Sequence, residues 1–162
     1  MKVPNPLGTI ENTRTPEQRS HMEETIGKGK CPFCDLDKKL NIPLRHTIHW
    51  NIWKNPFPYP NHKEHIVIAP GRHVTDINFL SNEEWIELLQ LICWAINKYD
   101  LKGGGVVMRF GEPKYNAGTL NHLHVQIQAP DGEHTSIAVF GKGPALRPMI
   151  KLLIEEKWQT TV

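Results

Sequence analysis

The chain has 162 residues, of which 39% are hydrophobic and 22% charged, a composition that suits one folded domain and excludes a wholly disordered chain. The net charge of +2 is too small to indicate a nucleic-acid polymer or a membrane surface as a partner, and we expect neither. No apolar run approaches the ~18–20 residues that span a bilayer, and the first residues carry no secretory signal. We therefore expect a soluble cytoplasmic protein.

The N-terminal segment, residues 1–29, is polar and contains several Pro, Thr and Glu residues. Its pattern predicts only a short helix over Pro16–Ile26. We expect a loosely attached arm that carries no chemistry, followed by a single domain over residues 30–162.

Two strands are predicted in the first half of this domain. The segment His46–Trp53 (HTIHWNIW) has the β-branched and aromatic content of a strand, and the Pro-rich segment Asn55–Asn61 cannot continue it. The second strand is His65–Ala69, which ends at Pro70-Gly71.

A long helix follows these strands. Ser81 and Glu84 have the spacing of a capping box, and the run Leu101–Gly105 stops the helix. Its apolar residues recur at steps of three and four and predict one buried face: Trp85, Leu88, Leu89, Ile92, Ile96 and Tyr99. Cys93, inside the same apolar stretch, is expected in the core.

The remaining segments predict three more strands and a terminal helix. The strands are Val106–Phe110, His122–Ala129 and Ser136–Phe140, and the helix is Pro148–Trp158. Strands mixed with one long helix, without regular alternation, favour an α+β fold. We expect an antiparallel sheet of about five strands with the helices on one face.

The strand His122–Ala129 begins with an unusual alternation, His-Leu-His-Val-Gln-Ile-Gln. Because successive side chains of a strand point to opposite faces, the Leu, Val and Ile residues face one way and the two His and two Gln residues face the other. A solvated outer face would explain polar residues without any chemistry. Two imidazoles followed by two amides are a rare choice for such a face, and we interpret them as a site.

The segment Asn116–Gln126 (NAGTLNHLHVQ) resembles the active-site motif of the histidine-triad (HIT) superfamily. It is similar in particular to the branch in which Gln replaces the third His, which contains galactose-1-phosphate uridylyltransferase and the dinucleoside polyphosphate phosphorylases. The strand that ends at Pro70, the long helix and the glycine-rich turn extend the resemblance over roughly Cys31 to Pro130. The resemblance implies a HIT-like fold and a homodimer.

The resemblance also implies the roles of two side chains. His124 attacks the α-phosphorus of a nucleotide and forms a nucleotidyl-histidine, which a second acceptor then cleaves. Gln126 can hydrogen-bond a phosphoryl oxygen but has no proton to release, which favours transfer over hydrolysis. We expect a nucleotidyltransferase or phosphorylase acting on a nucleoside phosphoanhydride or nucleotide sugar. The alternatives are a nucleotide hydrolase, and a zinc-stabilised nucleotide-binding module without turnover.

Five further residues are candidates for substrate binding. By resemblance, Asn116, Gly118 and Thr119 contact the phosphate or the sugar, and Asn55 lies near the nucleoside. An ordinary turn or loop would explain the same residues. His65 either lines the nucleotide pocket or is a core histidine whose ring nitrogens are satisfied.

The pair Cys31-x2-Cys34 indicates a metal or redox site, because three Cys is an odd number for a disulfide framework. Tetrahedral zinc needs two further ligands. Local partners would be His46 and His49, but their spacing is shorter than that of a zinc finger, and on one strand they would face opposite sides.

The resemblance to zinc-containing members of the superfamily implies a different pair, His73 and His122. Zinc held there would be structural, because it would tie the N-terminal loop to the catalytic strand without an open coordination position. The remaining alternatives are a bare dithiol, or a site that has lost its metal.

Overall fold

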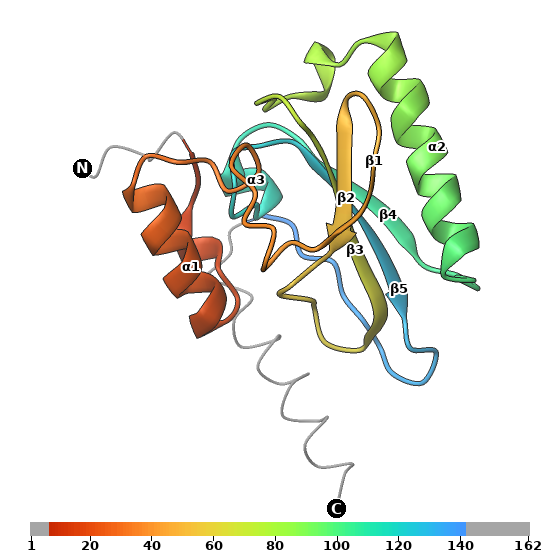
Figure 1. The fold of residues 1–162 in the computed structure, drawn as a ribbon. Helices are drawn as coiled ribbons and strands as arrows, with labels where there is room; N and C mark the ends of the chain where they lie inside the picture. The colour runs from red at the N-terminus through yellow and green to blue at the C-terminus, as the bar shows by residue number, and fades with distance from the viewer. Residues whose placement is uncertain (1–6, 142–162) are drawn as a thin grey trace, which may run out of the picture.

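The computed structural model describes residues 7–141 and shows one five-stranded antiparallel sheet, in the order β1-β2-β3-β5-β4, with helices on both sides (Figure 1). The strands are β1 Pro43–His46, β2 Trp50–Lys54, β3 His62–Pro70, β4 Gly105–Arg109 and β5 His124–Pro130. The helices are α1 Pro16–Gly27, α2 Asn82–Lys98 and the single turn α3 Pro113–Asn116, with 3-10 turns at Ile10–Asn12 and Ile77–Phe79. The predicted α+β class is confirmed.

The strand composition differs from the prediction in two places. The predicted strand His46–Trp53 is interrupted by a hairpin turn: His46 ends β1, Trp50–Trp53 belong to β2, and Thr47 closes the turn by exchanging hydrogen bonds with Trp50. Ser136–Phe140 forms no strand. The predicted helix Pro148–Trp158 lies outside the described residues.

Helix α2 begins with the predicted capping box, in which Ser81 and Glu84 exchange hydrogen bonds. Its buried face differs from the prediction, because Leu91 is buried whereas Leu89 is 62% exposed. Cys93 is also exposed, so its assignment to the core is wrong. The apolar residues of this helix cover a wider arc than one sheet face can bury, and periodicity alone does not choose among them.

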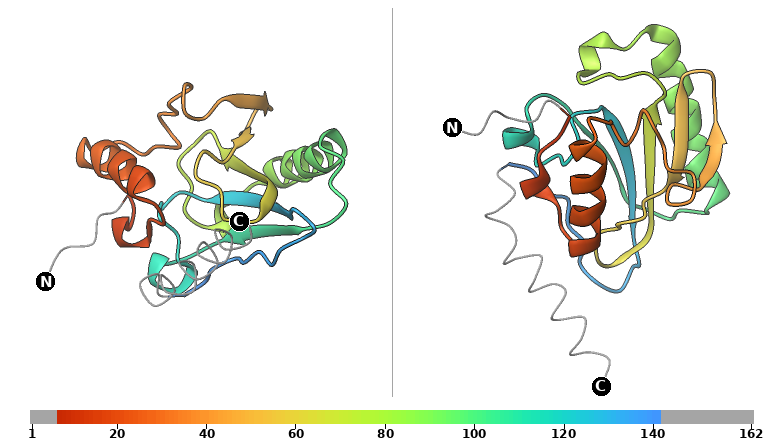
Figure 2. Two further views of the ribbon diagram at one scale, coloured as in Figure 1. Left: turned by 90° about the horizontal axis from the view of Figure 1, so that it is seen from below. Right: turned by 60° about the vertical axis from the view of Figure 1, so that its left-hand side comes forward.

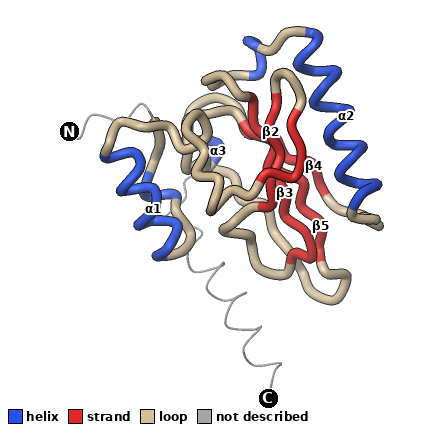
Figure 3. The backbone as a smooth tube through the Cα atoms, in the orientation of Figure 1, coloured by secondary structure: helices blue, strands red, loops and turns tan. Residues whose placement is uncertain are grey.

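The main core lies between α2 and the sheet. Ile66 and Ile68 of β3 pack there with Val125 and Ile127 of β5. Since strand residues alternate, this packing turns the intervening residues of both strands toward the opposite face. The backbone tube shows the sheet between α2 and α1 (Figure 3).

The N-terminal segment lies on the side of that opposite face and packs on the loop before β5, so the expectation of a loose arm and of helices on one face is wrong (Figure 2). Met22 and Ile26 of α1 form a buried cluster with Leu120, and Gly8 forms a β-bridge with the same residue. This apolar contact joins the segment to the loop that precedes β5. Within residues 7–141 no helix combines the length and the apolarity needed to cross a membrane.

Candidate functional site

Strand β5 lies between β3 and β4, and its register brings the polar side chains together. His124 is opposite Arg109 of β4, and Gln128 is opposite His65 of β3. Residues opposite one another share a face, so these side chains and Gln126 all lie on the face away from α2. All five residues are buried, which excludes a solvated outer face.

This face forms the floor of a cleft that encloses about 620 Å³, part of it open to solvent. Five of the residues predicted for the site line the cleft together: Asn55, Gly118, Thr119, His124 and Gln126. The N-terminal segment supplies part of the opposite wall.

The hydrogen bonds of His124 define its tautomer. Its Nδ1–H donates to the carbonyl oxygen of His122 at 2.8 Å, so the lone pair is on Nε2, which accepts from the side-chain amide of Gln126 at 3.2 Å. Burial lowers the pKa of His124 to about 4, and the positive charge of Arg109 acts in the same direction. Phe33 packs edge-on against the ring at 5.3 Å. His124 therefore presents a neutral imidazole with an unprotonated Nε2.

The orientation of the Gln126 amide follows from its neighbours. The backbone N–H of Tyr59 donates to Nδ1 of His65 at 3.1 Å, and burial lowers the pKa of His65 to about 3, so its single proton is on Nε2. That Nε2–H donates to Oε1 of Gln126 at 3.2 Å, and the amide of Gln128 donates to the same oxygen at 2.8 Å. The nitrogen of the Gln126 amide is thereby turned toward His124.

His65 lies behind the cleft, where it is hydrogen-bonded to Gln126. It is 4% exposed, both of its ring nitrogens have partners, and it is not among the residues that line the cleft. Of the two interpretations, the structure favours the satisfied core histidine.

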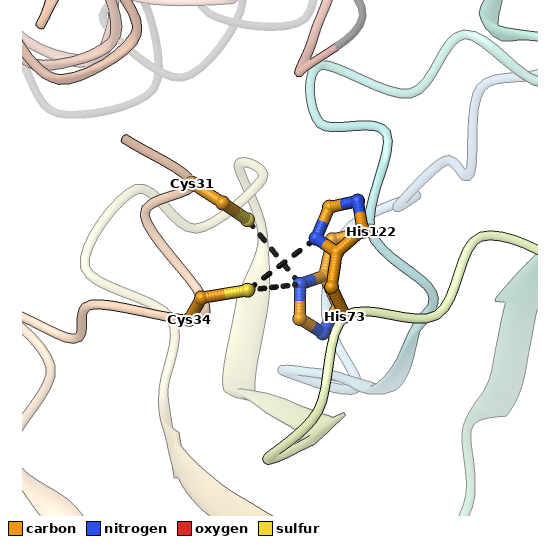
Figure 4. A group of neighbouring side chains, drawn as sticks. All are labelled: Cys31, Cys34, His73 and His122. Atoms are coloured by element: carbon orange, nitrogen blue, oxygen red, sulfur yellow. Dashed lines mark hydrogen bonds between the residues drawn. The ribbon is translucent and has the colours of Figure 1, made fainter. Parts of the chain in front are cut away.

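The Cys-x2-Cys loop lies beside the start of β5, where a group of four side chains meets (Figure 4). The group consists of Cys31, Cys34, His73 and His122, whose ligand atoms all lie within 4.8 Å of one another. Nδ1 of His122 lies 3.3 Å from Sγ of Cys31 and 3.5 Å from Sγ of Cys34. Nδ1 of His73 lies 3.3 Å from Sγ of Cys34.

This donor set fits zinc. With Zn–S bonds of ~2.3 Å and Zn–N bonds of ~2.0–2.1 Å, tetrahedral geometry puts sulfur and nitrogen ligands about 3.5 Å apart. Nε2 of His122 lies 3.1 Å from the carbonyl oxygen of Pro70, which assigns the proton to Nε2 and the lone pair of Nδ1 to the cluster. Burial lowers the pKa of His122 to about 4, and His73 acts in the same direction. The pKa of the Cys34 thiol is raised to about 11. Desolvation of the sulfur is the larger cause, and the neighbouring Cys31 is the smaller one.

The alternative zinc site, in which His46 and His49 join the two cysteines, is not formed. Nδ1 of His49 is 2.9 Å from Oε1 of Glu87 on α2, and neither His46 nor His49 belongs to the cysteine cluster of the described residues. The hairpin between β1 and β2 carries both histidines away from Cys31 and Cys34.

The loop before β5 is held by its own side chains. The amide of Asn116 donates to the carbonyl oxygens of Phe110 and Gly111, and its Oδ1 accepts from the backbone of Gly118 at 2.7 Å. A Cβ at Gly118 would meet that Oδ1 at 2.7 Å, so a larger residue here would require the Asn116 side chain to move. Asn116 therefore shapes the loop, while Gly118 and Thr119 line the cleft.

Two residues of the site were missed by the sequence reasoning, whereas Gln128 was placed on the polar face of the strand without a role of its own. Arg109 had a weak signal, as a single charge within the predicted apolar strand Val106–Phe110. Arg14 had none, because nothing in a polar arm indicates that one of its side chains enters a cleft.

Neither a protein-family model nor a curated protein matches the sequence. Solved structures do match. The chain superposes on a HIT family hydrolase from Clostridium thermocellum with 18% identity and a TM-score of 0.52, covering 65% of this chain and 94% of that one. It also superposes on a histidine triad nucleotide-binding protein from Candida albicans with 16% identity and a TM-score of 0.53, covering 81% of this chain and 99% of that one.

A Zn-bound histidine triad family protein from Mycobacterium smegmatis is similarly close, with 15% identity, a TM-score of 0.53, and coverage of 83% of this chain and 99% of that one. The chain therefore has the fold of the histidine-triad proteins, which confirms the fold predicted from the His-x-His-x-Gln motif. At these identities the likeness defines the fold, and the chemistry has to be argued from the site.

Proposed function

We propose that the protein is a nucleotidyltransferase or phosphorylase that acts on a nucleoside phosphoanhydride or nucleotide sugar through a nucleotidyl-histidine. The observation that supports this most is the buried, neutral His124, whose Nδ1–H is bound to the backbone and whose ring lines the cleft. An imidazole held in this tautomer is a nucleophile that needs no base to activate it.

The proposed reaction has two displacements. Nε2 of His124 forms a bond to the α-phosphorus while the bond to the leaving-group oxygen breaks, and the leaving group departs with the electron pair. An oxygen of the acceptor then attacks the same phosphorus, the N–P bond breaks and the lone pair returns to Nε2. The amide of Gln126, which donates to Nε2 in this structure, would donate instead to a phosphoryl oxygen.

Gln126 supports a phosphate-bearing acceptor rather than water. Water must lose a proton as it attacks, and a general base supplies ~10²–10⁴-fold help, which an amide cannot give. Inorganic phosphate is already anionic at neutral pH and needs no deprotonation. The alternative is a hydrolase, which the name of the similar C. thermocellum protein favours. The third reading is nucleotide binding without turnover; the similar C. albicans protein is named as nucleotide-binding.

One assay separates the three readings. The wild type is incubated with dinucleoside polyphosphates with and without phosphate, and we expect turnover that depends on phosphate and yields a nucleoside diphosphate. Gln126→His should shift the products toward mononucleotides. Equal rates without phosphate would support the hydrolase, and no turnover in either buffer would support the binding module.

The nucleophile is tested by trapping. Quenching the wild type with labelled substrate in alkali should leave a base-stable, acid-labile adduct, as expected of a phosphoramidate. His124→Ala should give none, whereas His134→Ala, which changes an exposed histidine paired with Asp131, should give the wild-type amount. An adduct that persists in His124→Ala would remove His124 from this role.

We also propose that the cluster of Cys31, Cys34, His73 and His122 holds a structural zinc ion. Zinc bound by four protein ligands has no open position, and its contribution would be to cross-link the N-terminal loop to the start of β5. His122 is two residues before His124 and its carbonyl oxygen accepts the Nδ1–H of that ring. The metal site would thus hold the carbonyl that defines the His124 tautomer.

A homodimer is a further proposal, supported by apolar surface on α2 and β4. Strand β4 is at the edge of the sheet, and Val106 on it is 50% exposed. Ile96 of α2 and Val106 line one hollow, so the two surfaces are continuous. Light scattering should give twice the chain mass of 18.6 kDa, and a single-chain mass at micromolar concentration would refute the dimer.

A further inference from the structure

Two arginines enter the cleft beside His124, one from each side. Arg109 comes from β4 and lies opposite His124 in the sheet, while Arg14 comes from the N-terminal segment. Within residues 7–141 neither guanidinium meets a carboxylate: their hydrogen bonds go to backbone oxygens and to the hydroxyl of Tyr59.

The N-terminal segment is tied down so that Arg14 is aimed into the cleft. The amide of Asn12 donates to the carbonyl oxygen of Gly118 at 2.8 Å, and the backbone N–H of Arg14 donates to Gln18 of α1 at 2.9 Å. The side chain then lies across the ring of Tyr59, with its central carbon 4.1 Å from the ring centroid, and donates to the carbonyl oxygen of Phe57 at 2.7 Å.

Tyr59 links the two arginines. Its ring stacks on His65 on one side and contacts Arg14, and its hydroxyl accepts from Nη2 of Arg109 at 3.3 Å. Arg109 is 6% exposed and also donates to the carbonyl oxygen of Val139 at 3.0 Å. Both guanidiniums therefore have defined positions before any ligand binds, and both retain donors that these bonds do not use.

The charge of the cleft is not balanced by the protein. No Asp or Glu is among the described residues that line it. Burial lowers the pKa of Arg14 below its usual value, and the nearby Arg109 acts in the same direction. Arg109 is buried and Arg14 is partly buried, and two guanidiniums close to each other in such surroundings are costly unless an anion joins them.

We propose that Arg14 and Arg109 form a subsite for a second phosphate group, next to the one that His124 attacks. The proposal rests on the proposed function and assigns to these two arginines the phosphate that is linked to the α-phosphate of the substrate. Guanidinium groups bind phosphate oxygens through paired, charge-assisted hydrogen bonds, which a neutral leaving group cannot accept. The N-terminal segment, which lies outside the predicted domain, would then supply substrate specificity.

The test compares nucleoside monophosphates with diphosphates in equilibrium binding, without turnover. The pairs AMP and ADP, GMP and GDP, UMP and UDP, and CMP and CDP are titrated at one salt concentration, so that an unknown base preference cancels within each pair. For the pair that binds best, we expect the wild type to bind the diphosphate at least about tenfold more tightly, which is 1.4 kcal/mol.

In Arg14→Gln this ratio should fall below about threefold, and Arg109→Gln should behave alike. Arg14→Lys should keep a larger ratio than Arg14→Gln because it keeps the charge. The control is Arg19→Gln on α1, an exposed arginine paired with Glu23, which should keep the wild-type ratio.

The outcomes distinguish this subsite from the proposed function. An unchanged ratio in Arg14→Gln, or a wild-type ratio near one with tight monophosphate binding, would overturn the subsite and leave nucleotide binding standing. Failure of all eight nucleotides to bind the wild type would overturn the proposed function, and the subsite with it.

Discussion

Loss of the proposed zinc site should be visible in both metal content and stability. In Cys34→Ser the thiolate is replaced by a hydroxyl, a poor zinc ligand at neutral pH. The cluster would be left with three donors, of which His73 is on the surface. We expect purified wild type to hold about one zinc per chain and Cys34→Ser to lose it.

The expected size of the stability effect follows from the loops that the metal closes. Cys34 and His73 are 39 residues apart in the chain, and Cys34 and His122 are 88 apart. In the chain-entropy relation used for disulfides, one closure of the shorter loop contributes about 4 kcal/mol to the free energy of unfolding at 25 °C. With a urea m-value of about 2 kcal/mol per molar, the unfolding midpoint should fall by about 2 M.

The assay is urea unfolding followed by tryptophan fluorescence, since Trp50 and Trp53 are buried in the sheet. Cys93→Ser is the matched control, because it changes an exposed cysteine outside the cluster, and it should keep both zinc and midpoint. His49→Ala should also keep the metal. Full zinc content in Cys34→Ser, or metal removal that leaves the wild-type midpoint unchanged, would refute the reasoning.

Two further predictions concern side chains behind the site. Gln128→Leu removes one of the two donors that hold Oε1 of Gln126. Because a hydrogen bond contributes about 0.5–1.5 kcal/mol, kcat should fall roughly three- to tenfold while KM stays within about twofold of wild type. An unchanged kcat would contradict the idea that Gln128 positions Gln126. Glu84→Gln removes a buried carboxylate that accepts two hydrogen bonds from Arg72 and should lower the free energy of unfolding by about 1–3 kcal/mol at pH 7. Arg72 holds the pKa of Glu84 below its usual 4.5, so the stabilisation is present above that pH and is lost as the pH falls through the folded-state pKa. Urea midpoints of wild type and variant should therefore converge in acid, and a constant difference would contradict the pairing.

Several features of this protein follow from short stretches of sequence. The alternation from His122 to Gln128 defines which side chains share a face, because the period of a strand is two residues. The capping box at Ser81 marks the start of α2 through hydrogen bonds within one turn. In each case the groups that interact are neighbours in the chain, so the sequence pattern predicts the feature without knowledge of the fold.

The sequence also limited the metal site without completing it. The Cys31-x2-Cys34 pair indicates a metal, but the choice between two pairs of histidines depended on where β3 ends and β5 begins in space. Local spacing could only weaken the pair His46 and His49. The hairpin at Thr47, which no composition argument revealed, moved both away from the cysteines.

The rest was decided by tertiary structure, because it depends on contacts between segments far apart in the chain. Sheet register places Arg109 opposite His124, and the packing of α1 on Leu120 brings Arg14 to the same cleft. Both steps depend on apolar burial and strand pairing summed over many residues, so the sequence around each arginine does not show which residues its side chain meets. The sequence by itself therefore determined the His-x-His-x-Gln motif and the fold class, while only the folded chain showed the charged cleft around that motif.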